Sequence, residues 1–187
     1  LLVRLPAPDP HLVRKVLDAG VRTLLVPRIE TAAEARKAVA ATQFTHDGEP
    51  GERGIGLGRS SRWGANMDEY VDREDGSVLL GVMIETRRAV ENLEDILAVP
   101  GLGFVFVGPA DLSVSMGEPL ATDSPAIRNQ IERIRRTTTQ TDVPLGGIAS
   151  DATEGRDMIE DGYQLLRVGN ELSAARSVLG DRLAALR

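Results

Sequence analysis

The chain has 187 residues, 42% of them hydrophobic, so it can bury a substantial core in one domain spanning residues 1–187. Its lack of cysteine excludes disulfides and thiolate metal sites. Its net charge of −6 and its scattered basic residues argue against a nucleic-acid partner. Because no apolar run approaches membrane-spanning length and residues 1–10 lack a secretory signal pattern, we expect a cytoplasmic protein with no membrane partner.

Apolar runs of strand length alternate with amphipathic stretches, an order typical of a parallel α/β fold. We predict strands over residues 1–5, 22–27, 78–84, 103–107, 143–148 and 164–168. Helix starts are predicted at residues whose side chains commonly cap helices, namely Asp9, Thr31, Thr86, Ser124 and Asp151. Gly20 and Gly162 are predicted helix stops, and residues 171–187 are predicted to form a closing helix with an apolar face.

Residues 43–77 interrupt this alternation and are rich in Gly, Asp, Glu and Arg, so we interpret them as a long functional loop. The loop contains Gly54, Gly56 and Gly58, a spacing seen in dinucleotide-binding motifs. Such a motif needs a preceding strand and a following helix, and neither is evident here. We interpret Trp63 as an anchor that holds the loop on the rest of the fold.

The first predicted strand begins at Leu1, without an initiator Met or a preceding helix. A closed (β/α)8 barrel takes about 250 residues, and six βα units in this chain leave room for two more at the front. We therefore expect a TIM barrel that lacks its first two βα units in this chain.

Glu85 and Asp111 each stand where an apolar strand-like run stops, in VLLGVMIET and GFVFVGPADLS. A carboxylate at the end of a buried strand is costly unless it is paired, hydrogen-bonded or bound to a metal. One hypothesis is that the two carboxylates share a divalent cation. The alternative is that they only cap the segments that follow, and the chemistry of the residues leaves both open.

Several segments carry a family resemblance: VRLPAPDP, TLLVPRIETAAEA, RGIGLGRSSRW, IETRRAVENLEDILAVPGLGFVFVGPADLS and the VGN after the last strand. Together they resemble the HpcH/HpaI aldolase family of metal-dependent class II pyruvate aldolases, whose fold is a barrel of the phosphoenolpyruvate/pyruvate type. The resemblance implies an aldehyde-lyase that splits a 4-hydroxy-2-oxo acid into pyruvate and an aldehyde through a metal-stabilised enolate. It also implies a homo-oligomer, in the family a hexamer built from trimers or dimers.

The resemblance assigns the metal to Glu85 and Asp111, with Mg²⁺ or Mn²⁺ expected and Co²⁺ as a further option. Such ions suit hard oxygen ligands. It implies that Arg4, at the end of the first strand, is catalytic and contacts the 2-oxo group of the substrate and the developing enolate. The small-molecule partners are therefore a 2-oxo acid and an aldehyde.

The GPADLS block is expected to bind the substrate carboxylate. By resemblance, Gly108 and Pro109 shape the turn, and the backbone N–H groups of Ala110 and Asp111 receive the carboxylate. Met83 stands where many members of the family have a glutamine that orders water or substrate, so we expect an altered substrate choice or rate.

The family's catalytic base is a histidine on the strand before the one that ends in Arg4, and this sequence has no such residue. His11 and His46 are interpreted as surface residues. Lys15 and Lys37 lie in helical stretches, which disfavours a lysine Schiff base. Two alternatives stay open: a CoA-ester lyase of the citrate lyase beta or malyl-CoA lyase type, and a truncated or inactive homologue acting only as a folded subunit.

Overall fold

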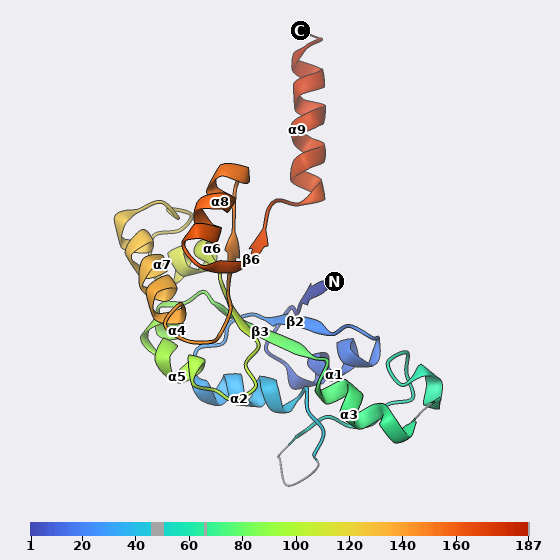
Figure 1. Ribbon diagram of the computed structural model, residues 1–187. Helices are drawn as coiled ribbons and strands as arrows, with labels where there is room; N and C mark the ends of the chain where they lie inside the picture. Colours follow the sequence, from blue (N-terminus) through green and yellow to red (C-terminus); the bar gives the residue numbers. More distant parts are fainter. Residues whose placement is uncertain (46–50, 66, 187) are drawn as a thin grey trace.

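A computed structural model describes residues 1–45, 51–65 and 67–186 and shows one parallel sheet with helices packed around it (Figure 1). Each strand of the sheet pairs with the next one in sequence, from β1 to β6. The strands are β1 (Leu2–Arg4), β2 (Thr23–Val26), β3 (Leu79–Ile84), β4 (Phe104–Val107), β5 (Leu145–Ile148) and β6 (Tyr163–Arg167). The six predicted strands and the α/β class are confirmed.

The sheet is curled, and β1 and β6 are its two outer strands. The described strands therefore form a half-barrel, with all side chains of one face directed toward the hollow of the curl. A closed barrel with two further βα units remains a prediction. Residues 1–187 as one domain also remain a prediction.

Five helices begin at the predicted caps, and the predicted closing helix begins at Glu171, whereas the starts of α3, α5 and α6 are not predicted. They are α1 (Pro10–Asp18), α2 (Ala32–Ala40), α3 (Tyr70–Asp75), α4 (Arg87–Glu91), α5 (Leu93–Leu97), α6 (Pro109–Ser115), α7 (Pro125–Thr138), α8 (Ala152–Glu160) and α9 (Glu171–Ala184). All five predicted caps accept a backbone N–H, and Thr31 forms a full capping box with Glu34. Gly20 and Gly162 follow α1 and α8 with φ angles of 96° and 94°, which glycine adopts without strain.

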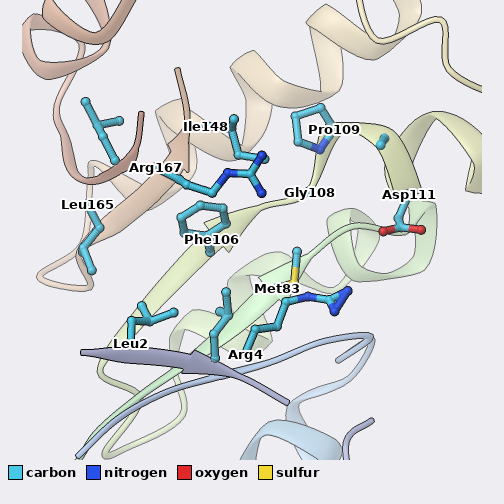
Figure 2. A pocket seen from close by; sticks show the side chains of 13 residues that line it. Leu2, Arg4, Met83, Phe106, Gly108, Pro109, Asp111, Ile148, Leu165 and Arg167 are labelled. Atoms are coloured by element: carbon cyan, nitrogen blue, oxygen red, sulfur yellow. The ribbon is translucent and has the colours of Figure 1, made fainter. Parts of the chain in front are cut away.

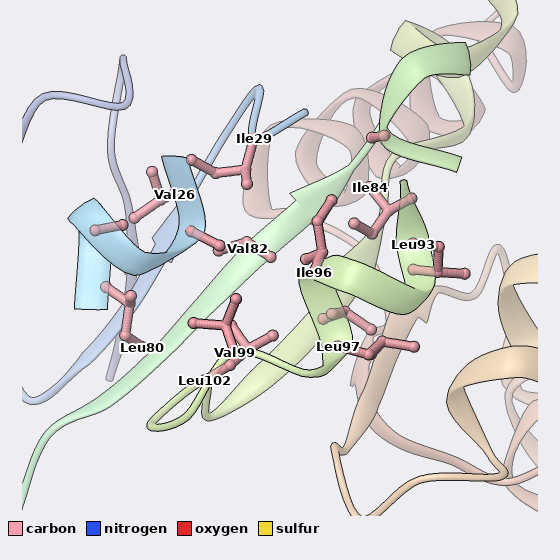
Figure 3. Close-up of a cluster of buried hydrophobic side chains, with 14 of the residues drawn as sticks. Val26, Ile29, Leu80, Val82, Ile84, Leu93, Ile96, Leu97, Val99 and Leu102 are labelled. Atoms are coloured by element: carbon pink, nitrogen blue, oxygen red, sulfur yellow. The ribbon is translucent and has the colours of Figure 1, made fainter. Parts of the chain in front are cut away.

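The two faces of the sheet contact different clusters of hydrophobic side chains. The outer face packs against the helices in the main core, in which Val82 and Ile84 of β3 meet Leu93 and Ile96 of α5 (Figure 3). Side chains alternate along a strand, so Met83 points the other way, into the hollow of the curl. There it packs in a smaller cluster of Leu25, Met83, Phe104 and Phe106, with Ile148 and Leu165 beside it.

Glycines make room for the aromatic rings inside the curl. A Cβ on Gly146 would lie 2.5 Å from Cδ2 of Phe106, and a Cβ on Gly81 would overlap the ring of Phe104. The rings of Phe104 and Phe106 therefore lie over the glycines of neighbouring strands and fill part of the hollow inside the curl.

The segment 43–77, which the sequence predicts to be a long functional loop, is helical in part, and its functional role remains a prediction. It holds the short 3-10 helices Arg62–Gly64 and Met67–Glu69 and the helix α3. The buried ring of Tyr70 and the buried carboxylate of Glu74 attach α3 to the rest of the fold, and Glu74 lies 2.6 Å from Arg22 and 3.0 Å from Arg53. The prediction of Trp63 as the anchor is wrong, because its side chain is 73% exposed.

Gly56 and Gly58 of this segment serve close packing. A Cβ on Gly56 would lie 2.9 Å from Oδ2 of Asp18, and one on Gly58 would lie 2.9 Å from the carbonyl oxygen of Asp18. The chain passes over the end of α1 at these points, which accounts for Gly56 and Gly58 without a nucleotide, whereas a Cβ on Gly54 would meet no atom within 4 Å.

Helix α9 stands away from the sheet (Figure 1), and every one of its residues, from 171 to 184, is exposed. Its exposed apolar side chains are Leu172, Val178, Leu179 and Leu183. Within the described ranges, no helix has the length and apolar character needed to cross a membrane.

Alkaline pH is expected to destabilise the fold through Tyr163. Burial raises the pKa of Tyr163 to about 12 from an ordinary 10.0, although nearby Arg135 acts in the opposite direction. The unfolded chain releases the phenol proton first, so the stabilisation is complete below pH 10 and is lost as the pH rises toward 12. The free energy of unfolding in urea should fall by about 2 kcal/mol more in the parent than in Tyr163→Phe between pH 9 and pH 11.5. Equal losses in the two proteins would contradict this account.

Candidate active site

A pocket of about 840 Å³ opens at the carboxyl ends of the strands (Figure 2). This is the end at which α/β barrels place their reactive groups. All the residues predicted to catalyse or to bind substrate line it, namely Arg4, Met83, Gly108, Pro109, Ala110 and Asp111. The remaining lining is apolar except for one further cation, Arg167.

Glu85 follows β3 directly and lies against this pocket, behind Gly108. Its side chain is 1% exposed, and its Oε1 accepts the backbone N–H of Arg28 at 2.7 Å. Its Oε2 is buried without a hydrogen-bond partner among the described residues. Burial raises the pKa of Glu85, and the nearby Asp111 carboxylate raises it further, while the Arg28 N–H and the charge of Arg4 lower it.

The capping alternative does not hold for either carboxylate. Helix α4 is capped by Thr86, whose Oγ1 accepts from the N–H of Ala89 at 3.1 Å. Asp111 lies inside the first turn of α6, whose N-cap residue is Gly108. Glu85 is therefore a buried carboxylate that the local backbone does not require.

Gly108 lets the end of β4 approach Glu85 closely. A Cβ at Gly108 would lie 2.7 Å from Cβ of Glu85, 2.9 Å from its Oε2 and 3.1 Å from Cε of Met83. Because Gly108 has no Cβ, no side chain separates the unpartnered Oε2 of Glu85 from the turn that carries Asp111. The sequence predicts a shaping role for Gly108 in the turn, and the structure adds this close contact with Glu85.

Arg28 is a residue of the site that the sequence analysis missed. It follows β2 and Pro27 with a φ of 55°, a left-handed conformation that is costly for a residue with a side chain. This conformation directs its backbone N–H at Glu85. No sequence pattern signals it, because the requirement comes from a residue on the neighbouring strand.

The other predicted chemical groups lie elsewhere. His11 is in the first turn of α1, and Lys15 and Lys37 are on α1 and α2, all outside the pocket lining. This agrees with the interpretation of His11 as a surface residue and offers no lysine for a Schiff base. His46 lies outside the described residues.

The two carboxylates fit a hard divalent cation. The described part of the chain holds no group of three or more His, Cys, Asp and Glu side chains that could bind a metal. Among the described side chains, Glu85 and Asp111 would be the ligands, and two carboxylates leave positions for water and substrate. A cation there would partner the orphaned Oε2 and offset the repulsion between the two carboxylates.

The fold and the site place this chain in a known family of lyases. Residues 1–177 match the family model described as HpcH/HpaI aldolase/citrate lyase, and the chain belongs to that family. Its fold matches the crystal structure of an HpcH/HpaI aldolase/citrate lyase family protein from Burkholderia cenocepacia J2315. The TM-score is 0.93 at 34% sequence identity, over 100% of this chain and 73% of that one.

Two curated proteins with similar sequences are both named as aldolases. The chain is 39% identical over 170 residues to a hydroxypyruvate/pyruvate aldolase of Cupriavidus necator, covering 90% of this chain and 62% of that protein. It is 36% identical over 173 residues to a 2-keto-3-deoxy-L-rhamnonate aldolase of Klebsiella pneumoniae subsp. pneumoniae, covering 92% of this chain and 64% of that protein. The chain thus spans less than two thirds of the length of either relative.

Proposed function

We propose that this chain is the metal-binding and substrate-binding part of a pyruvate aldolase, an aldehyde-lyase that cleaves or forms a 4-hydroxy-2-oxo acid. The observation that carries the proposal is the buried Oε2 of Glu85, which has no hydrogen-bond partner among the described residues and lies near Asp111, behind Gly108 of the strand-end pocket. The two curated relatives, both named as aldolases, support the same chemistry. They favour it over the CoA-ester lyase alternative.

Glu85 and Asp111 would hold the cation, with Mg²⁺ or Mn²⁺ as the expected ion and Co²⁺ as a further one. When bound, the cation would supply Lewis-acid polarisation of the substrate 2-oxo group. The buried setting of Glu85 keeps water from competing for the carboxylate, which strengthens its interaction with a cation.

The protein's own groups act on the substrate as follows. The amides of Ala110 and Asp111 lie in the first turn of α6, where backbone N–H groups have no intrahelical partner, and they bind the 2-oxo acid carboxylate. Arg4 faces the 2-oxo oxygen. When the C3–C4 bond breaks, its electron pair moves into the pyruvate half, and Arg4 stabilises the negative charge that develops on that oxygen.

The coproduct leaves as an aldehyde once the 4-hydroxyl has lost its proton. The resemblance implies a histidine as the base, and no residue of the described pocket has that role. Met83 and Phe106 provide an apolar wall beside the reacting carbons. Met83 lacks the hydrogen-bonding amide of the glutamine expected at this position, so substrate choice is set by shape there.

We also propose that the protein is a homo-oligomer. Helix α9 exposes Leu172, Val178, Leu179 and Leu183, and apolar residues on a helix whose described residues are all exposed indicate an association surface. A second copy of the chain would cover this helix.

The test of the aldolase proposal is pyruvate release from a panel of 4-hydroxy-2-oxo acids with and without Mg²⁺ or Mn²⁺. The natural protein carrying this chain should release pyruvate only with metal. Glu85→Gln and Asp111→Asn should each lose at least about 100-fold of that rate, because each removes a carboxylate ligand. The exposed Glu91→Gln serves as the control and should keep the parent rate.

Metal-independent release by both ligand variants would contradict the proposal. Cleavage of acyl-CoA substrates by a metal-loaded parent that releases no pyruvate would replace it with the CoA-ester lyase alternative.

A further inference from the structure

Ser113, in helix α6, carries a buried hydroxyl that the proposed chemistry does not use. Its side chain is 0% exposed. The hydroxyl donates to the carbonyl oxygen of Ala110 at 2.7 Å and accepts the backbone N–H of Leu120 at 3.0 Å. A serine hydroxyl has a single proton, so this pair of bonds fixes the direction of that proton toward Ala110.

The peptide unit between Ala110 and Asp111 connects this hydroxyl to the pocket. The carbonyl of Ala110 and the N–H of Asp111 belong to one planar trans unit, so they point in opposite directions. Both residues line the pocket (Figure 2). In α6 the N–H of Leu112 donates to the carbonyl of Gly108 at 3.0 Å, and the N–H of Asp111, one residue earlier, is among those that a helix leaves without an internal partner. Holding the Ala110 carbonyl therefore also holds the Asp111 N–H.

The loop after α6 adopts a costly backbone conformation to reach Ser113. Leu120 has a φ of 65°, in the left-handed region, and its side chain is 78% exposed, so packing of that side chain does not require the conformation. Its N–H donates to the hydroxyl of Ser113, and the N–H of Glu118 donates to the carbonyl of Ser113 at 2.9 Å. Arg28 is the parallel case, because its left-handed backbone supplies an N–H to Glu85.

A hydroxyl that bonds the carbonyl three residues earlier is common near helices and often has no further role. Thr42 is such a residue: it is 5% exposed, and its Oγ1 donates to the carbonyl of Val39 at 2.7 Å, outside the pocket lining. Ser113 differs in two respects. It also accepts an N–H from a strained loop, and the carbonyl that it holds belongs to a peptide unit of the pocket.

We propose that Ser113 is a positioning residue, which orients the peptide N–H of Asp111 that binds the carboxylate of the 2-oxo acid. It acts through the Ala110 carbonyl, and the Leu120 N–H in turn orients its hydroxyl. Hydrogen bonds in series polarise one another, so the Asp111 N–H becomes a better donor to an anion. This inference rests on the proposed function. The cation is held by side chains, so Ser113 affects binding of the 2-oxo acid and not binding of the metal.

Binding of pyruvate and of Mn²⁺ tests this role in the natural protein. By calorimetry on the Mn²⁺-saturated protein, Ser113→Ala should bind pyruvate about 10-fold more weakly than the parent. Its Mn²⁺ affinity should stay within about 2-fold of the parent value. Its kcat for a cleaved 4-hydroxy-2-oxo acid should also stay within about 2-fold, because the carboxylate contact is the same in the ground state and the transition state.

Thr42→Val is the matched control, because it removes a buried hydroxyl that makes the same kind of carbonyl bond away from the pocket. It should bind pyruvate and Mn²⁺ as the parent does. Mn²⁺ binding by Ser113→Ala also reports that this variant is folded.

The outcomes separate the two proposals. If Ser113→Ala binds pyruvate with the affinity of the parent, the role of Ser113 is wrong and the aldolase proposal stands. If Ser113→Ala loses Mn²⁺ affinity and pyruvate affinity to the same extent, Ser113 only supports α6, and the positioning role is again wrong. If the Mn²⁺-saturated parent neither binds pyruvate nor releases it from any 4-hydroxy-2-oxo acid, both proposals are wrong.

Discussion

Glu85→Gln is expected to abolish metal-dependent pyruvate release and, at the same time, to raise the thermal stability of the metal-free protein. The first effect follows from the loss of a ligand. The second follows from the environment of Glu85: burial and the Asp111 carboxylate raise its pKa, and its Oε2 has no described hydrogen-bond partner. A neutral amide removes the buried charge and can donate to Asp111.

The pH dependence of stability has a defined sign. Because the pKa of Glu85 is raised on folding, the folded state holds this proton more tightly than the unfolded chain does. The resulting stabilisation is present below the ordinary pKa of 4.5 and is lost as the pH rises through the raised folded value. Melting temperatures of the metal-free proteins at pH 7 should therefore be higher for Glu85→Gln than for the parent, with a smaller gap near pH 4.5.

Glu74→Gln is the matched control, because Glu74 is also 1% exposed but lies between Arg22 and Arg53. Removing its charge leaves the buried guanidinium of Arg53 without its partner and should cost about 3 to 5 kcal/mol of unfolding free energy. Glu74 lies outside the pocket, so the folded variant should still release pyruvate. A loss of stability in Glu85→Gln as large as that in Glu74→Gln would show that Glu85 is a structural residue.

Gly108→Ala is expected to reduce pyruvate release by about 100-fold, although it changes no chemical group. The new Cβ would lie 2.7 Å from Cβ of Glu85, which is fixed by the end of β3. Neither atom can move without shifting the strand ends, so the two carboxylates lose their spacing, and displacements of about 1 Å cost rates of this size. Steady-state kinetics at saturating Mn²⁺ and Mn²⁺ affinity measure the effect.

Gly54→Ala is the control for a glycine-to-alanine change, because a Cβ there meets no atom within 4 Å. It should leave rate and affinity unchanged. Parent-like kinetics in Gly108→Ala would mean that the turn yields easily and that the close contact with Glu85 is not needed for activity.

The sequence predicts well what depends on local chemistry. Strand positions follow from runs such as 78–84, and the cap at Thr31 is readable because Glu34 follows at the right spacing. Glu85 and Asp111 could be paired in advance because parallel strands place their carboxyl ends on one edge of the sheet. These features need only short segments and the rule that strands run parallel.

Other features depend on contacts between distant segments. The left-handed backbone of Arg28 serves Glu85, 57 residues away, and no local pattern encodes it. Arg167 resembles any arginine at the end of a strand until the register with β5, which includes an irregularity between Leu145 and Gly146, turns it into the pocket. Trp63 was predicted to anchor its segment, but that role belongs to Tyr70, whose burial depends on tertiary packing.

Mn²⁺ binding measured by electron paramagnetic resonance tests the central claim most directly, because the signal of free Mn²⁺ falls as the ion is bound. The account predicts that the natural protein binds one Mn²⁺ per chain and that Glu85→Gln and Asp111→Asn each lose this binding while remaining folded. Binding of Mn²⁺ by both variants with the affinity of the parent would contradict the assignment of this carboxylate pair as the metal site.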